Sequence, residues 1–245
     1  MEKKTKQKGT DLIYGIHPII ELLKAKRRKL AILYTTKPTP KAWQQLEPLL
    51  PKGLQIQYVQ RDVLHKLAGT TDHQGVVGYA APFAFRKKLF DAEKQTFLLM
   101  LDGVQDPRNL GAILRSAYCT NVDGVILTQK GSAPLNAVAL KASAGLAEYL
   151  EILQVPTAKA GIQMLDKANY ALYLAVLEKG QDASSITYKK PSCLVIGGEG
   201  IGISKEIRSS GTLITLPQKT ADISYNASVA AGILLFIIAK QYTKI

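Results

Sequence analysis

Residues 213–242 read LITLPQKTADISYNASVAAGILLFIIAKQY and join a strand, a loop and a helix in one run. The strand is Leu213–Leu216, and Pro217 ends it because proline lacks the N–H that a central strand needs. In the polar loop that follows, Asn226 or Ser228 is suited to cap a helix. The helix is apolar on nearly every face, so we expect it to be buried in the domain, against a second subunit, or both.

Composition narrows the classes of protein to which the chain can belong. Its 245 residues suffice for one large domain or two modest ones. The net charge of +13 favours a polyanionic partner, most often nucleic acid. Cys119 and Cys193 lie in apolar runs without paired spacing, which predicts buried free thiols in a reducing compartment and no metal site. The chain has neither a signal peptide nor an apolar run of full membrane length, so we expect a cytoplasmic protein that does not contact membranes.

The N-terminal third predicts a basic arm and a small α/β domain. Residues 1–10 hold four lysines and almost nothing apolar, which predicts a tail that is disordered alone and contacts phosphate in a complex. Residues 11–81 predict the domain, with helices after Gly15, near 41–50 and near 61–68, and strands at 30–34, 54–59 and 75–80. Within it, a run of basic residues from Lys24 to Lys29 lies between the first helix and the strand at 30–34. Such a run is usually a solvated face, but beside a basic arm RNA contact is a reasonable second interpretation. The cations singled out for this contact are Lys26, Arg27 and Arg28.

The remaining chain predicts a linker and a larger α/β domain. Residues 82–95 are polar and basic without a long period, so we expect a linker. From 96 to 245, apolar strands alternate with helices, which predicts a parallel sheet covered on both faces. The expected strands are 97–101, 124–127, 149–153, 171–177, 193–196 and 213–216, and the expected helices are near 109–119, 135–144, 156–168, 205–209 and at the C-terminus.

Ligands of parallel sheets bind at the carboxyl ends of the strands, where three polar loops are expected here. The first, 102–109, ends in Asp106-Pro107-Arg108-Asn109, with Asn109 at the expected helix start. Arg115 lies six residues later, and taken alone it is more often a surface arginine of an amphipathic helix. The third loop, 217–226, contains Ser224 and Asn226, which taken alone only cap a helix and close a turn.

The second loop, 197–204, reads GGEGIGIS and surrounds Glu199 with glycines, which permit close approach of backbone to a ligand. It lacks the Gly-Lys-Ser/Thr of a P-loop and does not fit GxGxxG, which argues against a nucleotide-binding α/β enzyme of those classes. The carboxylate would repel a polyphosphate and would tolerate a cationic or hydroxyl-bearing ligand such as S-adenosylmethionine. A plain tight turn remains an alternative for this loop.

Three stretches in this order resemble the SpoU (TrmH-type) family of RNA 2′-O-ribose methyltransferases, part of the SPOUT superfamily. They are DPRNLGAILRSA, LVIGGEGIGIS and ITLPQKTADISYNASVAAGI, at 106–117, 194–204 and 214–233. With YGIHPIIELL and DHQGVVGYA in the first domain, the resemblance spans nearly the whole chain. The N-terminal features are most similar to the subgroup that methylates a guanosine of 23S ribosomal RNA.

The resemblance implies a fold and partners that composition and spacing do not show. Residues 96–245 should form an α/β domain with a parallel sheet and a deep trefoil knot (SPOUT), an exception to the rule against threaded chains. Residues 11–81 should be an RNA-binding module of the ribosomal protein L30e type. Family members are homodimers that pack through the knotted domain, which would give the apolar final helix a partner.

The resemblance also implies the site and its chemistry. S-adenosylmethionine should be the cofactor, and its expected contacts are Gly197, Gly198, Gly200, Leu216 and Tyr225. The family more often has leucine at the position of Tyr225. A ribose 2′-hydroxyl would attack the sulfonium methyl, and Arg115 matches the arginine beside that hydroxyl. Because arginine keeps its charge in proteins, we expect Arg115 to hold phosphate and stabilise the forming alkoxide rather than act as a base. The groups expected to orient Arg115 and the ribose are Asn109, Glu199, Ser224 and Asn226, and Arg108 is expected to contact RNA.

Three other functions stay open. A tRNA 2′-O-methyltransferase fits the residues as well as an enzyme that acts on ribosomal RNA. A non-catalytic RNA-binding protein with the same fold would need only the basic arm and the first domain. A nucleotide-binding enzyme is disfavoured by the missing phosphate-binding motifs.

Overall fold

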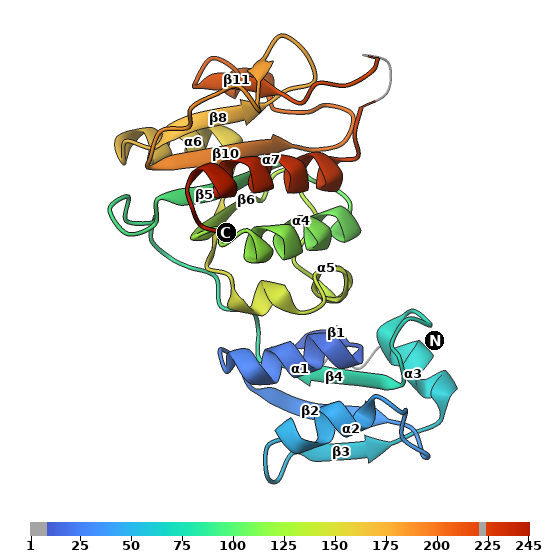
Figure 1. Cartoon of the computed structure of the whole chain (residues 1–245). Coiled ribbons are helices and arrows are strands. Elements are labelled where there is room, and N and C mark those ends of the chain that lie inside the picture. The colour runs from blue at the N-terminus through green and yellow to red at the C-terminus, as the bar shows by residue number, and fades with distance from the viewer. Residues whose placement is uncertain (1–8, 221–223) are drawn as a thin grey trace. The chain divides into compact units, whose positions relative to one another are not determined.

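The computed structural model describes residues 9–220 and 224–245, so most of the predicted basic arm lies outside the described residues. The described chain forms two compact units (Figure 1). The first contains the chain up to Ala84 together with Leu135–Tyr149, and the second contains Phe85–Pro134 and Leu150–Ile245. None of the described helices has the length and hydropathy that a membrane span requires.

The first unit is a four-stranded sheet with helices packed on it. Its strands lie in the order β1 (Asp11–Tyr14), β4 (Val76–Ala80), β2 (Leu30–Thr35) and β3 (Gln55–Tyr58). β4 runs antiparallel to both of its neighbours, whereas β2 and β3 are parallel. β1 was not predicted, because a strand of four residues is too short for a visible alternation. The helices are α1 (Ile16–Ala25), α2 (Trp43–Leu46) with a 3-10 turn at Glu47–Leu49, and α3 (Arg61–Ala68).

The segment Leu135–Tyr149 belongs by its contacts to the first unit, although the sequence analysis grouped it with the second domain. It contains α5 (Ala137–Ala142) and a 3-10 turn at Leu146–Tyr149, where a strand from residue 149 was expected. Tyr149 donates a hydrogen bond from its hydroxyl to Glu21 at 2.7 Å, and α5 packs against β1. The chain therefore leaves the second unit after Pro134 and returns to it at Leu150.

The same segment supplies the partner of Arg28, whose predicted role in RNA contact is wrong in this structure. The Arg28 side chain is 3% exposed, and its Nη2 lies 2.6 Å from Oε1 of Glu148, which is 2% exposed. Nη1 also lies 3.2 Å from Oδ2 of Asp11. A solvated charge run and a buried ion pair look alike in sequence, because Glu148 is 120 residues away.

The second unit is a seven-stranded sheet in the order β7-β6-β5-β10-β8-β11-β9, and every pairing in it is parallel. The predicted parallel sheet is confirmed. Its strands are β5 (Phe97–Asp102), β6 (Gly124–Thr128), β7 (Ile152–Val155), β8 (Ala171–Ala175), β9 (Gln181–Asp182), β10 (Ser192–Gly197) and β11 (Thr212–Thr215). β9 was not expected, because a strand of two residues leaves no pattern.

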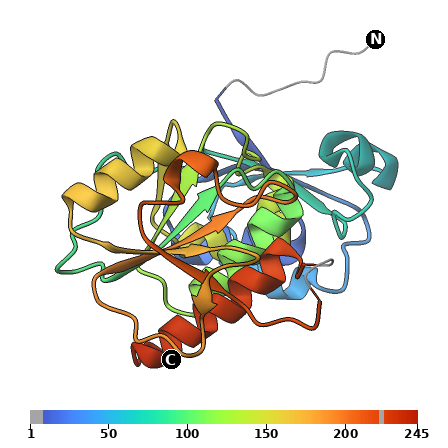
Figure 2. The same ribbon diagram turned by 90° about the horizontal axis from the view of Figure 1, so that it is seen from above.

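Helices cover both faces of this sheet, as Figure 2 shows. They are α4 (Pro107–Cys119), α6 (Ala158–Lys167) and α7 (Ala227–Gln241), and the helix expected at 205–209 is a 3-10 turn at Lys205–Ile207. Alternate residues of the central strands, such as Leu98 and Cys193, share a core with α6. On the other face α7 contacts β10 and lies beside α4 (Figure 1).

Most of the predicted linker is part of the second unit. From Phe85 onward the segment belongs to that unit, and the Arg86 N–H donates to the carbonyl of Ile152 at 2.7 Å. Phe90 is only 3% exposed, and a Cβ at Gly124 would lie 2.2 Å from its ring. Because the stretch is rich in lysine, its composition did not indicate that Phe90 is buried and anchors it to the second unit.

The final helix, α7, confirms the predicted cap, and it leaves open the predicted burial against a second subunit. Asn226 caps α7, because its Oδ1 accepts a hydrogen bond from the Ser228 N–H at 2.8 Å. One side of α7 is buried in the unit. The other side carries exposed apolar side chains, namely Val229, Ile233 and Phe236 at 48%, 37% and 53% exposure.

Candidate active site

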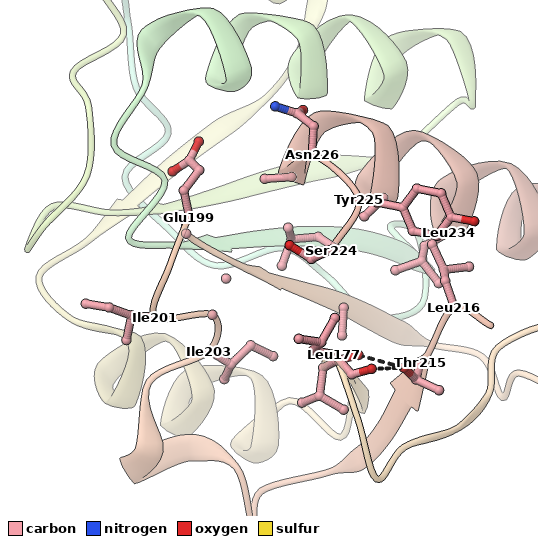
Figure 3. A pocket seen from close by; sticks show the side chains of 18 of the residues that line it. Leu177, Glu199, Ile201, Ile203, Thr215, Leu216, Ser224, Tyr225, Asn226 and Leu234 are labelled. Carbon is pink, nitrogen blue, oxygen red and sulfur yellow. Dashed lines mark hydrogen bonds between the residues drawn. The ribbon is translucent and has the colours of Figure 1, made fainter. Parts of the chain in front are cut away.

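A cavity of about 480 Å³ opens at the carboxyl ends of β8, β10 and β11 (Figure 3). Its wall comes from residues 175–177 at the end of β8, residues 196–203 at the end of β10 and in the loop that follows, residues 214–216 at the end of β11, and α7 with the residues before it. Parallel strands place their carboxyl ends at one edge, which is where ligands of such sheets bind. The volume lies within the usual range for small-molecule sites.

The loop after β8 was missing from the predicted site. Val176 and Leu177 in this loop, and Ala175 at the end of β8, are apolar, so no polar motif marks them in the sequence. Only the strand order predicts their place, because β8 lies between β10 and β11 and must end at the same edge. The cavity is also lined by residues that the sequence analysis did not single out, namely Ile201, Ile203, Arg208, Gln218 and Leu234.

The glycine loop after β10 is a tight turn that also forms the cavity wall. The Gly202 N–H donates to the carbonyl of Gly198 at 3.0 Å. A Cβ at Gly197 would lie 2.1 Å from the carbonyl carbon of Gly202, and one at Gly198 would lie 1.9 Å from the carbonyl oxygen of Gly103. Both positions therefore require glycine. The loop is therefore a tight turn that also lines a cavity, and its contact with a ligand stays a prediction.

A hydrogen-bond network joins the three predicted loops at the edge of the cavity. The Asn109 side-chain amide donates to Oε1 of Glu199 at 2.5 Å, and the Gln105 N–H donates to Oε2 at 3.2 Å. The Asn226 side-chain amide in turn donates to Oδ1 of Asn109 at 3.2 Å. Figure 3 shows Glu199 and Asn226 on the same side of the cavity. Residues separated by about 90 to 117 positions thus form one polar cluster.

The network holds Glu199 in its charged form. Partial burial by itself would raise the pKa of Glu199, but the hydrogen bonds from the Asn109 amide, its own N–H and the Gln105 N–H outweigh it and lower that pKa. A carboxylate at the mouth of the glycine loop gives the cavity a site of negative charge. Such a site suits a ligand that carries positive charge or hydroxyl groups.

This lowered pKa predicts a pH dependence of stability. The stabilisation that Glu199 contributes should be fully present above the ordinary glutamate pKa of about 4.3 and should be lost as pH falls through the lower folded value. The effect should stay below about 1 kcal/mol because the side chain is largely exposed. Urea unfolding of the wild type and of Glu199→Gln across the acid range measures it. A difference in unfolding free energy that does not change with pH would show that the network does not hold the charge.

The predicted cofactor residues all line the cavity. They are Gly197, Gly198, Gly200, Leu216 and Tyr225, and Ser224 lines it as well. The Tyr225 ring is 43% exposed and Figure 3 shows it near Leu216 and Leu234. Leu177, Ile201 and Ile203 add apolar surface across the cavity, so the wall combines apolar side chains with few polar groups. This composition is typical of a site for a nucleoside-sized ligand.

Helix α4 begins differently from the sequence prediction. Asp106 is its cap and accepts a hydrogen bond from the Arg108 N–H at 2.8 Å, whereas Asn109 was expected at the start. Asn109 is thereby free to hold Glu199. Arg115 lies six residues further along α4, about 9 Å along the helix axis, is exposed, and does not line the cavity of its own chain. Arg115 could therefore contact a substrate only if that substrate, or a second chain, lay over α4.

The remaining predicted cations are on the surface. Arg108 is exposed in the first turn of α4. In the first unit, Lys26 and Arg27 are exposed directly after α1, and Lys26 closes that helix in the left-handed conformation at φ 55°. These three side chains are accessible to a polyanion, unlike Arg28.

Family models and relatives match nearly the whole chain. The model described as the SpoU rRNA Methylase family matches residues 96–236, and the one described as RNA 2′-O ribose methyltransferase substrate binding matches residues 12–86. A 23S rRNA (guanosine-2′-O-)-methyltransferase RlmB of Shewanella oneidensis is 33% identical over 96% of this chain and 98% of its own length. An uncharacterised tRNA/rRNA methyltransferase of Mycolicibacterium gilvum is 31% identical over 96% of this chain and 78% of its own length.

Solved structures share the fold. An RNA 2′-O ribose methyltransferase has a TM-score of 0.85 at 22% identity and covers 99% of this chain and 93% of its own. The SpoU methyltransferase AviRb of Streptomyces viridochromogenes, solved with the cofactor AdoMet, has a TM-score of 0.79 at 19% identity and covers 96% and 91%. At these identities the likeness concerns the fold, and the cavity must be argued from its own residues.

Proposed function

Because the chain belongs to the SpoU rRNA methylase family, we propose that it transfers a methyl group from S-adenosylmethionine to a ribose 2′-hydroxyl of RNA. The observation that carries the proposal is the network that joins Asn109, Glu199 and Asn226 at the edge of the cavity. It brings together the three sequence stretches that resemble the family. The net charge of +13 supports a polyanionic substrate.

The residues of the cavity fit S-adenosylmethionine. Its adenosine matches the volume and the apolar wall formed by Leu177, Ile201 and Leu216. Its cationic groups match the charged form of Glu199, which would repel a polyphosphate. Gly197 and Gly198 line the cavity with backbone alone, because glycine has no side chain.

The cofactor would supply an activated methyl group, so the protein's task is to align the 2′-hydroxyl and stabilise the charge that develops on it. We assign this stabilisation to Arg115, whose planar guanidinium can hold phosphate and the forming alkoxide. Asn109, Glu199 and Asn226 would orient the ribose, and Ser224 at the cavity wall would assist them. Lys26, Arg27 and Arg108 would contact the RNA backbone.

The preferred substrate is a guanosine of 23S ribosomal RNA. The relative from Shewanella oneidensis is named for that activity and aligns over nearly its full length. A tRNA substrate is the second candidate, because the relative from Mycolicibacterium gilvum is named for tRNA or rRNA. A non-catalytic RNA-binding protein is the third, and binding of S-adenosylmethionine would exclude it.

The proposal includes a knotted second unit, a first unit of the ribosomal protein L30e type, and a homodimer. The exposed apolar side chains of α7, Val229, Ile233 and Phe236, support a second copy as their partner, because a soluble chain rarely leaves such a row uncovered. We also propose that the protein acts in the cytoplasm, where its free thiols would stay reduced. Cys193 is buried as predicted, whereas Cys119 is exposed, contrary to the sequence prediction.

Mapping of 2′-O-methyl groups tests the function. Cellular RNA is compared between a strain with the gene and one without it, and the purified protein is then given the RNA that loses a methyl group. We expect one guanosine of 23S ribosomal RNA to lose its 2′-O-methyl group and to regain it in the presence of S-adenosylmethionine. A methyl group lost from tRNA would favour the second candidate. Unchanged maps together with no cofactor binding would reject the enzyme.

A further inference from the structure

We propose that Arg208 binds the carboxylate of the amino-acid tail of S-adenosylmethionine, an assignment that rests on the proposed function of the cavity. Arg208 lines the cavity together with the glycine loop and the end of β11. The family resemblance did not single out this residue.

Among the described residues that line the cavity, only Glu199 and Arg208 are charged. Glu199 already accepts hydrogen bonds from the Asn109 amide and the Gln105 N–H. Arg208 differs, because its side chain has neither a hydrogen bond nor an ion pair with the described part of the chain. A guanidinium offers five donors in a planar fork, so Arg208 can bind an anionic partner without breaking an existing hydrogen bond or ion pair.

The backbone at Arg208 is well anchored although its side chain is unpaired. The Ser204 N–H donates to Oδ2 of Asp102 at 2.8 Å, which ties the end of the glycine loop to β5. Ile207 is 1% exposed and packs into the core beside α6. The Arg208 N–H donates to the carbonyl of Lys205 at 3.4 Å and closes the 3-10 turn. The guanidinium therefore extends from a fixed backbone, so that binding has to order the side chain alone and not the turn that carries it.

The charges of the ligand match this pair of residues. S-adenosylmethionine carries a sulfonium, an ammonium group and one carboxylate. A guanidinium repels the two cations and pairs with the carboxylate, for which its fork allows two parallel hydrogen bonds. Glu199 has the opposite preference and favours the cationic part. Two wall charges of opposite sign would therefore set the direction in which the methionine tail lies.

A pair of ligands separates this role from a structural one. Calorimetry measures the binding of S-adenosylmethionine and of decarboxylated S-adenosylmethionine, which keeps both cations and lacks only the carboxylate, to the full chain. Arg208→Ala should weaken binding of S-adenosylmethionine by about tenfold, the low end for a hydrogen-bonded charge. The same variant should bind the decarboxylated ligand as well as the wild type or better, because a repulsive charge is gone. Arg208→Lys should fall between wild type and Arg208→Ala.

Lys205→Ala is the matched control, because Lys205 is an exposed cation three residues away that does not line the cavity. It should leave both affinities unchanged. Equal weakening of both ligands by Arg208→Ala, or no weakening of either, would overturn the assignment while the proposed function stands. A wild type that binds neither ligand would overturn the proposed function and the assignment with it.

Discussion

Arg115→Ala is expected to abolish methylation of RNA while the protein still binds S-adenosylmethionine. Arg115 does not line the cavity, so its removal should leave the cofactor affinity unchanged. The loss of a positive charge at a forming alkoxide should lower the rate by about 10²–10³-fold or more. Arg115→Lys should also fail, because a lysine lacks the planar fork that holds two oxygens at once.

Single-turnover methylation with saturating RNA and calorimetry with the cofactor measure the two effects separately. Lys159→Ala is a suitable control, since Lys159 is an exposed cation on α6, on the opposite face of the sheet from α4. Near-normal turnover in Arg115→Ala would reject the role of this arginine. Loss of cofactor binding together with turnover would instead place Arg115 in the cofactor site, contrary to the structure.

Arg28→Ala should have the largest effect on stability. It would leave the Glu148 carboxylate, 2% exposed, without the guanidinium that lies 2.6 Å away. Removal of one partner of a buried ion pair costs about 3–5 kcal/mol, because the remaining charge stays in a medium of low polarity. The free energy of unfolding from urea titration, followed by probes in the first unit, measures this loss.

Two further variants separate stability from RNA binding. Lys29→Ala changes the neighbouring exposed side chain and should alter the free energy of unfolding by less than about 0.5 kcal/mol. Arg28→Met combined with Glu148→Leu should recover most of the lost stability, because an apolar pair of similar volume replaces the buried charges. A stable Arg28→Ala variant that binds RNA weakly would restore the role that the sequence analysis gave to Arg28.

The elements with a clear period were the easiest to predict. The strands at 97–102 and 192–197 are fully buried and are apolar except for Asp102 and Ser192 at their ends, and the sequence placed both within one residue at each end. The glycines at 197 and 198 were expected to allow close approach, and the structure brings other backbone within 2.1 Å of where their Cβ atoms would lie. Local chemistry suffices for the two strands, because an apolar run arises within the element itself. The requirement for glycine at 198 depends on a distant residue as well, because the carbonyl of Gly103 lies where its Cβ would be.

Predictions failed where a distant residue decides the meaning of a local pattern. The charge run that contains Arg28 was interpreted as a surface, because nothing near it in sequence signals Glu148. The stretch that contains Phe90 was interpreted as a linker, because one buried ring among lysines does not alter the composition. The loop after β8 was left out of the site, because only the order of the strands puts it beside the glycine loop.

The sequence by itself determined the family, the parallel sheet and the three stretches that resemble the methyltransferase motifs, since periodicity and motif order are properties of the chain. Only the tertiary structure decided that Asn109 holds Glu199, that Leu135–Tyr149 packs with the first unit, and that Arg208 faces the cavity. The physical reason is that a hydrogen bond or an ion pair acts over a few ångströms. Which residues come that close depends on how the strands are ordered in the sheet, and that order cannot be read directly from the sequence.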